Sequence, residues 1–175
     1  MAVVQHKKVR DVMIPLADYA TVTEDATVRE CIEVMRRALT GAKGDTYIRC
    51  LLVLDKEQRP RGILTLRDLI RAIEPGFADP QKLAETIQWA AAKPEFGWGE
   101  FFDEEQARER TTKTVKDVMR QLKLITVDAD APLLQAAFLM VKHNIGRLPV
   151  TEGDRVVGMV RLSEIFMEIA GAVAS

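Results

Sequence analysis

The residues best suited to chemistry are Gly62, Thr65 and Asp68, which are spaced three apart. They lie where a predicted strand passes into a predicted helix, and a helix N-terminus presents unpaired N–H groups that favour a phosphate. Gly62 allows a close approach to the backbone. The Thr65 hydroxyl can donate to a phosphate oxygen, and the Asp68 carboxylate can accept from two ribose hydroxyls. Together they indicate a site for a sugar phosphate.

The same pattern also has a purely structural interpretation. Thr65 and Asp68 match a variant of the capping box, in which each side chain accepts a hydrogen bond from a backbone N–H at the start of the helix. The two roles are compatible, because Thr65 can cap the helix while the site is empty and turn to a ligand when one binds.

A second strand-to-helix junction repeats the pattern with different side chains, Arg161 for threonine and Glu164 for aspartate. Arg161 can bind a phosphate through a bidentate charged contact, fill an empty cleft or point to solvent. Glu164 can meet a ribose at a different depth or complement the helix dipole as a first-turn acid. Ser163 can take over as N-cap. A polyphosphate that uses both Asp68 and Arg161 is a further alternative.

The two junctions belong to an internal repeat, which decides how the candidate residues are positioned. Matching segments occur in the same order in both halves: Val9-Arg10-Asp11-Val12-Met13 with Val115-Lys116-Asp117-Val118-Met119, Thr21-Val22 with Thr126-Val127, Ala26-Thr27-Val28 with Ala131-Pro132-Leu133, Leu51-Leu52-Val53 with Leu148-Pro149-Val150, and Gly62-Ile63-Leu64 with Gly158-Met159-Val160.

Each copy predicts a β-α-β-β-α unit. Apolar residues at helical spacing predict helices from 28 to 35 and from 133 to 140. Extended segments precede them, hairpins follow, and a second helix closes each copy. The remaining ranges are strands at 19–22, 50–54, 62–64, 124–127, 148–151 and 155–160, and closing helices at 66–73 and 163–170. One unit alone buries little apolar surface, so we expect the copies to pair about a pseudo-two-fold axis with a cleft between them.

Residues 76–112 lie outside the repeat. Asp79 and Pro80 predict a helix start, with Asp79 as N-cap, and Pro94 predicts its end. Residues 100–110 form an acidic segment that could be a second helix. Because the insert contains both tryptophans and four of the six phenylalanines, we expect it to pack on its own domain or on a partner: Phe77, Trp89, Phe96, Trp98, Phe101 and Phe102.

The composition limits the classes of function. The chain has 175 residues, 47% of them apolar and 29% charged, and a net charge of −1, so it is globular and has no field that favours nucleic acid. It lacks an apolar run of about 18 residues and a signal-peptide pattern, so no membrane association is expected. Two cysteines without CxxC spacing indicate a reduced, cytoplasmic protein. No zinc motif, Walker loop, dinucleotide fingerprint or nucleophile motif occurs.

The ordered double repeat resembles a tandem pair of CBS domains, also called a Bateman module. The resemblance covers roughly residues 9–75 and 115–170. It implies an α/β (α+β) fold of two pseudo-symmetric β-α-β-β-α motifs packed sheet to sheet. The expected domains are residues 1–75 for the first motif, 76–112 for the helical insert and 113–175 for the second motif.

The resemblance also implies a regulatory, non-catalytic sensor without a catalytic cofactor. Its expected ligand is AMP, ADP, ATP or a related adenosyl compound such as S-adenosylmethionine, bound in the cleft between the motifs. In similar proteins the positions of Thr65 and Asp68 bind phosphate and ribose. The expected nucleotide-binding set is Ala20, Thr21, Leu51, Leu52, Gly62, Thr65 and Asp68, and the second candidate set is Ile125, Thr126, Leu148, Pro149, Arg161 and Glu164.

Three hypotheses for function follow. The first is the nucleotide sensor, working as a homodimer through apolar helical faces and read by an unidentified effector protein. The second is a ligand-free structural homodimer that works through the aromatic insert. The third is an enzyme with catalysis in the insert, for which no base or nucleophile is recognisable.

Overall fold

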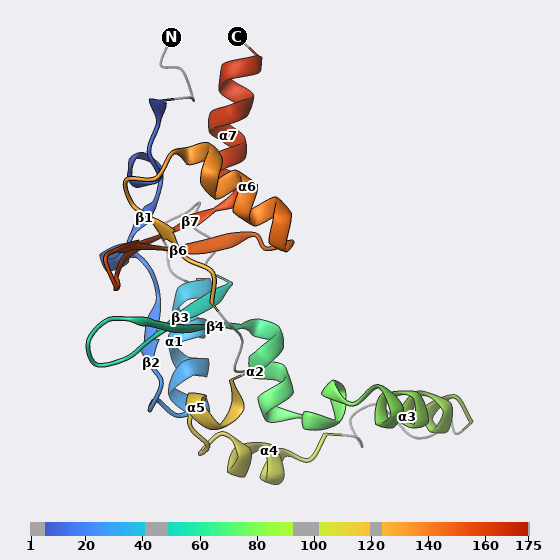
Figure 1. Ribbon diagram of the computed structural model, residues 1–175. Helices are drawn as coiled ribbons and strands as arrows, with labels where there is room; N and C mark the ends of the chain where they lie inside the picture. Colours follow the sequence, from blue (N-terminus) through green and yellow to red (C-terminus); the bar gives the residue numbers. More distant parts are fainter. Residues whose placement is uncertain (1–5, 41–48, 93–101, 120–123, 175) are drawn as a thin grey trace. The chain divides into compact units, whose positions relative to one another are not determined.

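The structure is a computed structural model that describes residues 6–40, 49–92, 102–119 and 124–174, and it has a mixed α/β fold (Figure 1). The predicted β-α-β-β-α order is confirmed in both copies. The first copy contains β2 (Thr21–Thr23), α1 (Val28–Thr40), β3 (Cys50–Leu54), β4 (Pro60–Thr65) and α2 (Leu66–Ile73). The second contains β5 (Val127–Asp128), α6 (Leu133–His143), β6 (Arg147–Glu152), β7 (Arg155–Arg161) and α7 (Leu162–Val173).

Further elements add to these two β-α-β-β-α sets. They are η2 (Val9–Asp11), β1 (Ile14–Pro15), η3 (Leu16–Asp18), η4 (Pro75–Ala78), α3 (Pro80–Ala92), α4 (Glu104–Arg110) and α5 (Val115–Val118).

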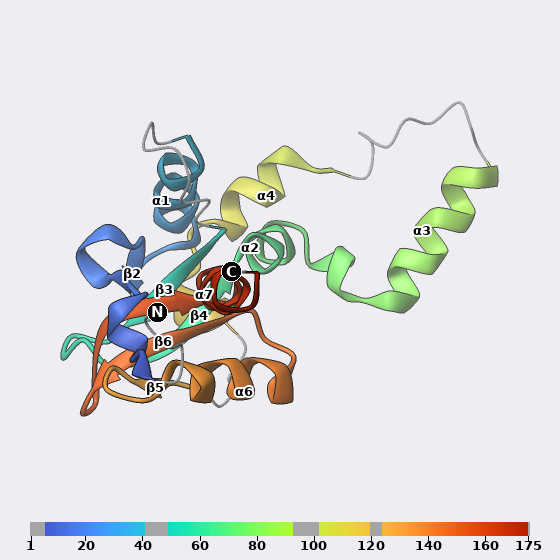
Figure 2. The ribbon, with the colours of Figure 1, turned by 90° about the horizontal axis from the view of Figure 1, so that it is seen from above.

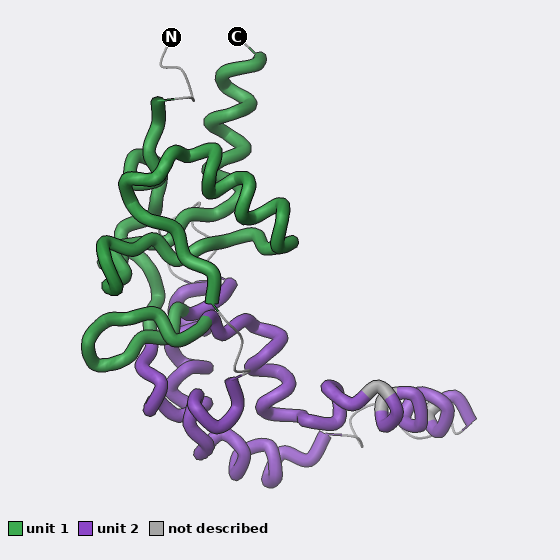
Figure 3. The backbone as a smooth tube through the Cα atoms, in the orientation of Figure 1, with its two compact units in different colours: residues 1–21, 52–62, 121–175 green, residues 22–51, 63–120 purple. Residues whose placement is uncertain are grey.

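The chain divides into two compact units, neither of which is continuous in sequence (Figure 3). Unit 1 comprises residues 1–21, 52–62 and 121–175, and unit 2 comprises residues 22–51 and 63–120. The boundaries fall inside β3 and β4, so each of these strands begins in one unit and ends in the other.

Unit 1 contains a four-stranded sheet in the order β1-β7-β6-β5. Strands β6 and β7 form the predicted hairpin, and β5 pairs parallel to β6. The edge strand β1 was not predicted, and it pairs antiparallel with β7 through Ile14 with Met159 and Pro15 with Gly158. A Cβ at position 158 would lie 2.5 Å from the Ile14 carbonyl oxygen, so this pairing requires glycine.

The core of unit 1 lies between the sheet and helices α6 and α7, which cover one face of it (Figure 1). The predicted face of α6 is confirmed, since Leu133, Ala136 and Met140 are buried and Ala137 packs against them. Val9, in η2, is also fully buried, and its N–H donates to the Ala131 carbonyl at 3.0 Å. The N-terminal segment is therefore an integral part of this core.

Unit 2 contains α1, α2 and the insert, and a three-stranded sheet has the order β2-β3-β4. The predicted face of α1 is confirmed, because Val28, Cys31 and Met35 are buried at helical spacing. Helix α1 packs against α2. The two helices thereby hold the strand-to-helix junction at Thr65 in place.

The insert forms both predicted helices. Asp79 is the N-cap of α3, and its carboxylate accepts from the N–H groups of Gln81 at 3.0 Å and Lys82 at 3.3 Å. Figure 2 shows α3 lying away from α1 and α2, while α4 returns beside α2. Helix α4 covers residues Glu104–Arg110 of the predicted segment. The positions Pro94, Phe96, Trp98 and Phe101 lie outside the described residues.

Arg110 joins α4 to the end of α2. Its Nη1 donates to the Ile73 carbonyl and to the Glu74 carboxylate, each at 3.0 Å, and its Nη2 donates to Gln106 at 3.0 Å. Of the two alternatives for the insert, its own domain or a partner, packing on its own domain is thus observed for α4. In α3, by contrast, Ile87 and Trp89 remain exposed.

Candidate functional site

The junction between β4 and α2 is a complete capping box. Thr65 is the N-cap, and its Oγ1 accepts from the Asp68 N–H at 3.3 Å. The Asp68 Oδ2 accepts from the Thr65 N–H at 2.9 Å and from the Thr65 hydroxyl at 2.6 Å. The capping interpretation is therefore confirmed. The Thr65 hydroxyl proton is directed at Asp68, so it would have to turn to reach a phosphate.

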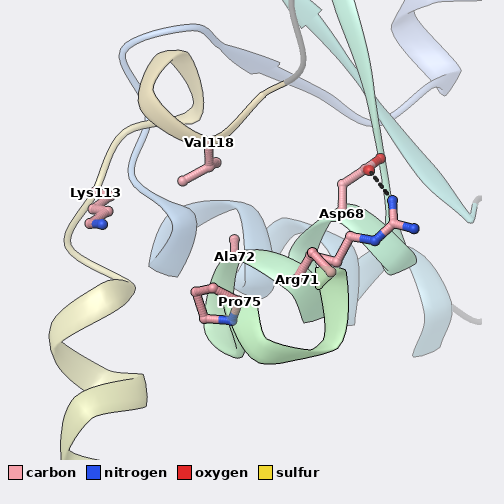
Figure 4. A pocket seen from close by; sticks show the side chains of 7 residues that line it. Asp68, Arg71, Ala72, Pro75, Lys113 and Val118 are labelled. Carbon is pink, nitrogen blue, oxygen red and sulfur yellow. Dashed lines mark ion pairs between the residues drawn. The ribbon is translucent and has the colours of Figure 1, made fainter. Parts of the chain in front are cut away.

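Asp68 also lines a pocket of about 230 Å³ in unit 2, and its other carboxylate oxygen, Oδ1, is turned toward Arg71 (Figure 4). Arg71, one turn further along α2, places Nη1 3.8 Å from the Asp68 Oδ1. That separation is an ion pair but is too long for a hydrogen bond. Asp68 therefore has one oxygen committed to the cap and one that can accept hydrogen bonds from a ligand.

The residues expected around an adenine occupy positions in both units. Leu52 donates its N–H to the Ala20 carbonyl at 3.1 Å, so the structure brings these two together, in unit 1. Leu51 and Leu52 are fully buried, while Ala20 and Thr21 are half-buried. Gly62 is buried in β4. The leucine side chains thus form core, and Ala20 and Thr21 are the more accessible residues of the set.

The second candidate set lies entirely in unit 1. Arg161 is the N-cap residue of α7, and the Glu164 carboxylate accepts from its N–H at 3.1 Å and from its Nε at 2.9 Å. Arg161 Nη2 also donates to Glu164. The expectation that Ser163 caps the helix is wrong, because α7 begins at Leu162 and Ser163 lies inside its first turn, donating to Glu164 at 3.1 Å.

This contact changes the proton affinity of both groups. The hydrogen bonds that the Arg161 guanidinium donates to Glu164 raise the pKa of Arg161 above its ordinary value. Burial acts to raise the pKa of Glu164, but the hydrogen bond and positive charge of Arg161 outweigh it and hold that pKa below 4.5. At the second junction the carboxylate is thus paired with the charged guanidinium of Arg161, whereas at the first junction it accepts from the uncharged hydroxyl of Thr65.

The other members of the second set lie on neighbouring strands. Leu148 and Pro149 are buried in β6 and pair with Val160 and Met159 of β7. Ile125 and Thr126 are half-buried just before β5. Arg147 is the cross-strand partner of Arg161, so two guanidinium-bearing residues lie side by side at this end of the hairpin.

Other chemistry has little support in the residues that the structure describes. Within these ranges no group of three or more His, Cys, Asp or Glu side chains is placed to hold a metal ion. Cys31 and Cys50 are not joined in a disulfide and are fully buried, and burial raises the pKa of Cys31 to about 11. Across the described ranges, the helices are too short or too polar to cross a membrane.

Comparison with known families agrees with the double repeat. The model of the CBS domain matches residues 9–75 and again residues 115–171. The chain belongs to the CBS domain family. The insert falls between the two matched segments, and both candidate junctions fall within them. No curated protein matches the chain significantly.

Solved structures of CBS domain proteins have the same fold. The CBS domain of a CBS domain-containing membrane protein from Sphaerobacter thermophilus is 23% identical, with a TM-score of 0.63, and the match covers 94% of this chain and 88% of that one. CBSX2 in complex with AMP is 18% identical, with a TM-score of 0.61 and coverage of 96% and 98%. The cytosolic domain of the Mg²⁺ channel MgtE in complex with ATP is 25% identical, with a TM-score of 0.61 and coverage of 93% and 49%.

Lys113 and Arg71 belong to the site's surroundings but were not foreseen from the sequence. Both line the pocket beside Asp68. Arg71 could have been found from its helical spacing, since it follows Asp68 by three residues. Lys113 precedes the second copy, and no local signal connects it with α2.

Proposed function

We propose that this CBS-domain pair is a regulatory module that binds an adenosine nucleotide and has no catalytic role. The observation that carries the proposal is the state of Asp68, which lines a pocket. Its Oδ2 accepts from the Thr65 N–H and hydroxyl, while its Oδ1 is 3.8 Å from Arg71, too far for a hydrogen bond. A carboxylate held in this way is ready to accept the two hydroxyls of a ribose. The complexes of CBSX2 with AMP and of MgtE with ATP support an adenine nucleotide as the ligand class.

The experiment is a thermal-shift screen of the full chain with AMP, ADP, ATP, S-adenosylmethionine and NAD. A ligand at about 100 times its Kd stabilises the folded protein by about 2.7 kcal/mol, which raises the Tm. Asp68→Ala should abolish the rise. If none of the five compounds raises the Tm of the unaltered protein, the proposal is wrong.

Asp117→Ala is the matched control. Thr114 and Asp117 form the same box at the start of α5, where the Asp117 Oδ2 accepts from the Thr114 N–H at 3.0 Å and from its hydroxyl at 2.7 Å. Both substitutions remove a capping box, but only Asp68 is assigned to the ligand. The control should lower the basal Tm and retain the ligand-induced rise.

We propose that the second junction binds a nucleotide less readily than the first. Ile125, Thr126, Leu148 and Pro149 would surround the base, but Arg161 and Glu164 already satisfy each other. A ribose would compete with Arg161 for Glu164. One ligand per chain is therefore the expected stoichiometry.

Regulation requires that the ligand bind two states of the protein with different affinity. We propose that nucleotide binding shifts the relative orientation of the CBS motifs, taken as residues 1–75 and 113–175, and that an effector protein reads this shift. The two buried thiols suit a reducing compartment, which supports a cytoplasmic location.

We propose that the chain is a homodimer through the face formed by α6 and α7, which pack against each other. Large apolar side chains point outward from both helices, including Phe138 at 61%, Phe166 at 63% and Met167 at 68% exposure. An apolar face of this kind marks an interface, and a second copy offers an identical apolar face. Phe138→Glu combined with Phe166→Glu should convert a dimer to a monomer in sedimentation experiments.

The alternative is a ligand-free homodimer that works through the insert, and exposed Phe77, Trp89 and Phe102 favour it. Ile87→Glu and Phe102→Ala test it in the same sedimentation experiment. Monomers from these two variants, together with an absence of ligand response, would support the alternative over the nucleotide sensor.

A further inference from the structure

The pocket beside Asp68 runs along one face of α2. Asp68, Arg71, Ala72 and Pro75 line it at helical spacing, so it extends from the first turn of the helix past the end of the last (Figure 4). On its other side are Lys113 and Val118, from the start of the second motif. All of these residues belong to unit 2.

The charged groups that line the pocket are two cations and one carboxylate. Asp68 and Arg71 form an ion pair with 3.8 Å between Oδ1 and Nη1. Because this is too long for a hydrogen bond, the guanidinium N–H groups of Arg71 can form shorter contacts with a ligand. Lys113 is held by its backbone, since its carbonyl accepts from the Val28 N–H at 2.8 Å and its N–H donates to the Arg110 carbonyl at 3.2 Å. Its charge also lies close enough to Asp117 to help lower the pKa of that carboxyl, after the larger effect of the Thr114 hydrogen bonds.

The size of the pocket fits part of a nucleotide. Its volume of about 230 Å³ is below the roughly 300–1,000 Å³ of sites that enclose a whole small molecule. It can therefore receive one end of a ligand whose remainder lies elsewhere. Because its lining has an excess of one positive charge next to the proposed ribose contact, the fitting end is the phosphate.

The capping box points to the same conclusion. The Thr65 hydroxyl donates to Asp68 at 2.6 Å and its oxygen accepts from the Asp68 N–H, so using it for a phosphate would disrupt the cap. Arg71 and Lys113 provide positive charge without that loss. Arginine adds a planar pair of donors that matches phosphate oxygens, and lysine adds a compact charge.

We propose that Arg71 and Lys113 bind the phosphate of the nucleotide whose ribose is held by Asp68. The inference rests on the proposed nucleotide-binding function and assigns the residues that distinguish a nucleotide from its nucleoside. Arg71 contacts the phosphate directly, and Lys113 closes the opposite wall of the pocket.

The test is isothermal titration calorimetry of the full chain with AMP and with adenosine. The unaltered protein should bind AMP at least about tenfold more tightly than adenosine, since a hydrogen bond to a charged group contributes roughly that factor or more. Arg71→Ala and Lys113→Ala should each reduce this ratio severalfold by weakening AMP alone. Their affinity for adenosine should be unchanged, which shows that the variants are folded.

Arg67→Ala and Lys116→Ala are matched controls. They remove the same charges from exposed positions on α2 and α5 that do not line the pocket. Both should keep the preference for AMP. An unaltered protein that binds adenosine and AMP equally, or a preference that survives in Arg71→Ala and Lys113→Ala, would overturn the phosphate assignment while leaving the nucleotide-binding function intact. Binding of neither compound, nor of any in the thermal screen, would overturn both.

Discussion

The Glu164 carboxylate accepts hydrogen bonds from both the backbone N–H and the guanidinium of Arg161, three residues earlier in the chain. The pair occupies the positions in the second CBS motif that Thr65 and Asp68 occupy in the first. The pair still caps the helix. However, both oxygens of the Glu164 carboxylate accept hydrogen bonds from Arg161, so neither is available to a ligand without competition.

The Arg161–Glu164 ion pair should make the free energy of unfolding depend on pH. Glu164→Gln is expected to lower the free energy of unfolding by about 1–2 kcal/mol at pH 7, because the pair is largely shielded from solvent. A carboxyl group whose pKa is lowered by folding stabilises the protein at pH values above its ordinary pKa of 4.5. This contribution is lost as the pH falls through the lower pKa of the folded state. Urea unfolding of both proteins between pH 7 and pH 3 measures the difference.

The difference between the free energies of unfolding of the two proteins should therefore shrink towards the acid end of that range. Glu104→Gln is the control, since its pair with Arg108 is exposed and should contribute little at any pH. A Glu164→Gln effect of equal size at pH 3 and pH 7 would contradict an ionised pair.

Gly158→Ala should destabilise the sheet of unit 1. The added methyl group would lie 2.5 Å from the Ile14 carbonyl oxygen and 2.9 Å from the Met13 sulfur, so β1 would have to move away from β7. We expect a loss of about 1–3 kcal/mol, measured by thermal unfolding. Gly146→Ala is the control, because no atom lies within 4 Å of a Cβ there. Equal Tm values for the two variants would contradict the close pairing of β1.

Arg110→Ala should loosen the insert from α2. The substitution removes three hydrogen bonds, two of them to the end of α2, and should lower the free energy of unfolding by about 1–3 kcal/mol. Arg108→Ala, in the same helix, removes an exposed pair and should cost at most about 0.5 kcal/mol. Urea titrations followed by circular dichroism compare them, and similar losses would mean that Arg110 does not anchor α4.

Cys31 and Cys50 should react with DTNB at pH 8 only when the protein opens. Both thiols are fully buried, and a pKa of about 11 keeps Cys31 protonated. Any ligand that stabilises the fold should slow the labelling. Leu39→Cys places a third thiol at an exposed position of α1 and should react at once. Fast labelling of the two native thiols would show that this core opens readily.

Helical and strand periodicity predicted the elements of the two repeats, because each has a buried face that is visible in local sequence. The buried positions Val28, Cys31 and Met35 of α1 are an example. Strand β1 could not be predicted in this way. It has two residues, and its partners Met159 and Gly158 lie at the other end of the chain.

At the candidate site, the sequence predicted the Thr65–Asp68 capping box, but the alternative that Ser163 caps α7 was wrong. The repeat itself contains the missing signal, since aligning Glu164 with Asp68 makes Arg161 the cap. The pocket was not predicted, because Lys113 reaches α2 only through the backbone pairing of the segment after α4 with the start of α1.

The pairing of Ile14 with Met159 also affects how the chain is made. On a ribosome that adds about 5–20 residues per second, strand β1 waits roughly 7–30 seconds for its partner to emerge. During that interval the apolar side chains of η2, including Val9, lack the core that later covers them. Folding of unit 1 is therefore expected to finish only after β7 has emerged from the ribosome, and molecular chaperones have this period in which to protect the nascent chain.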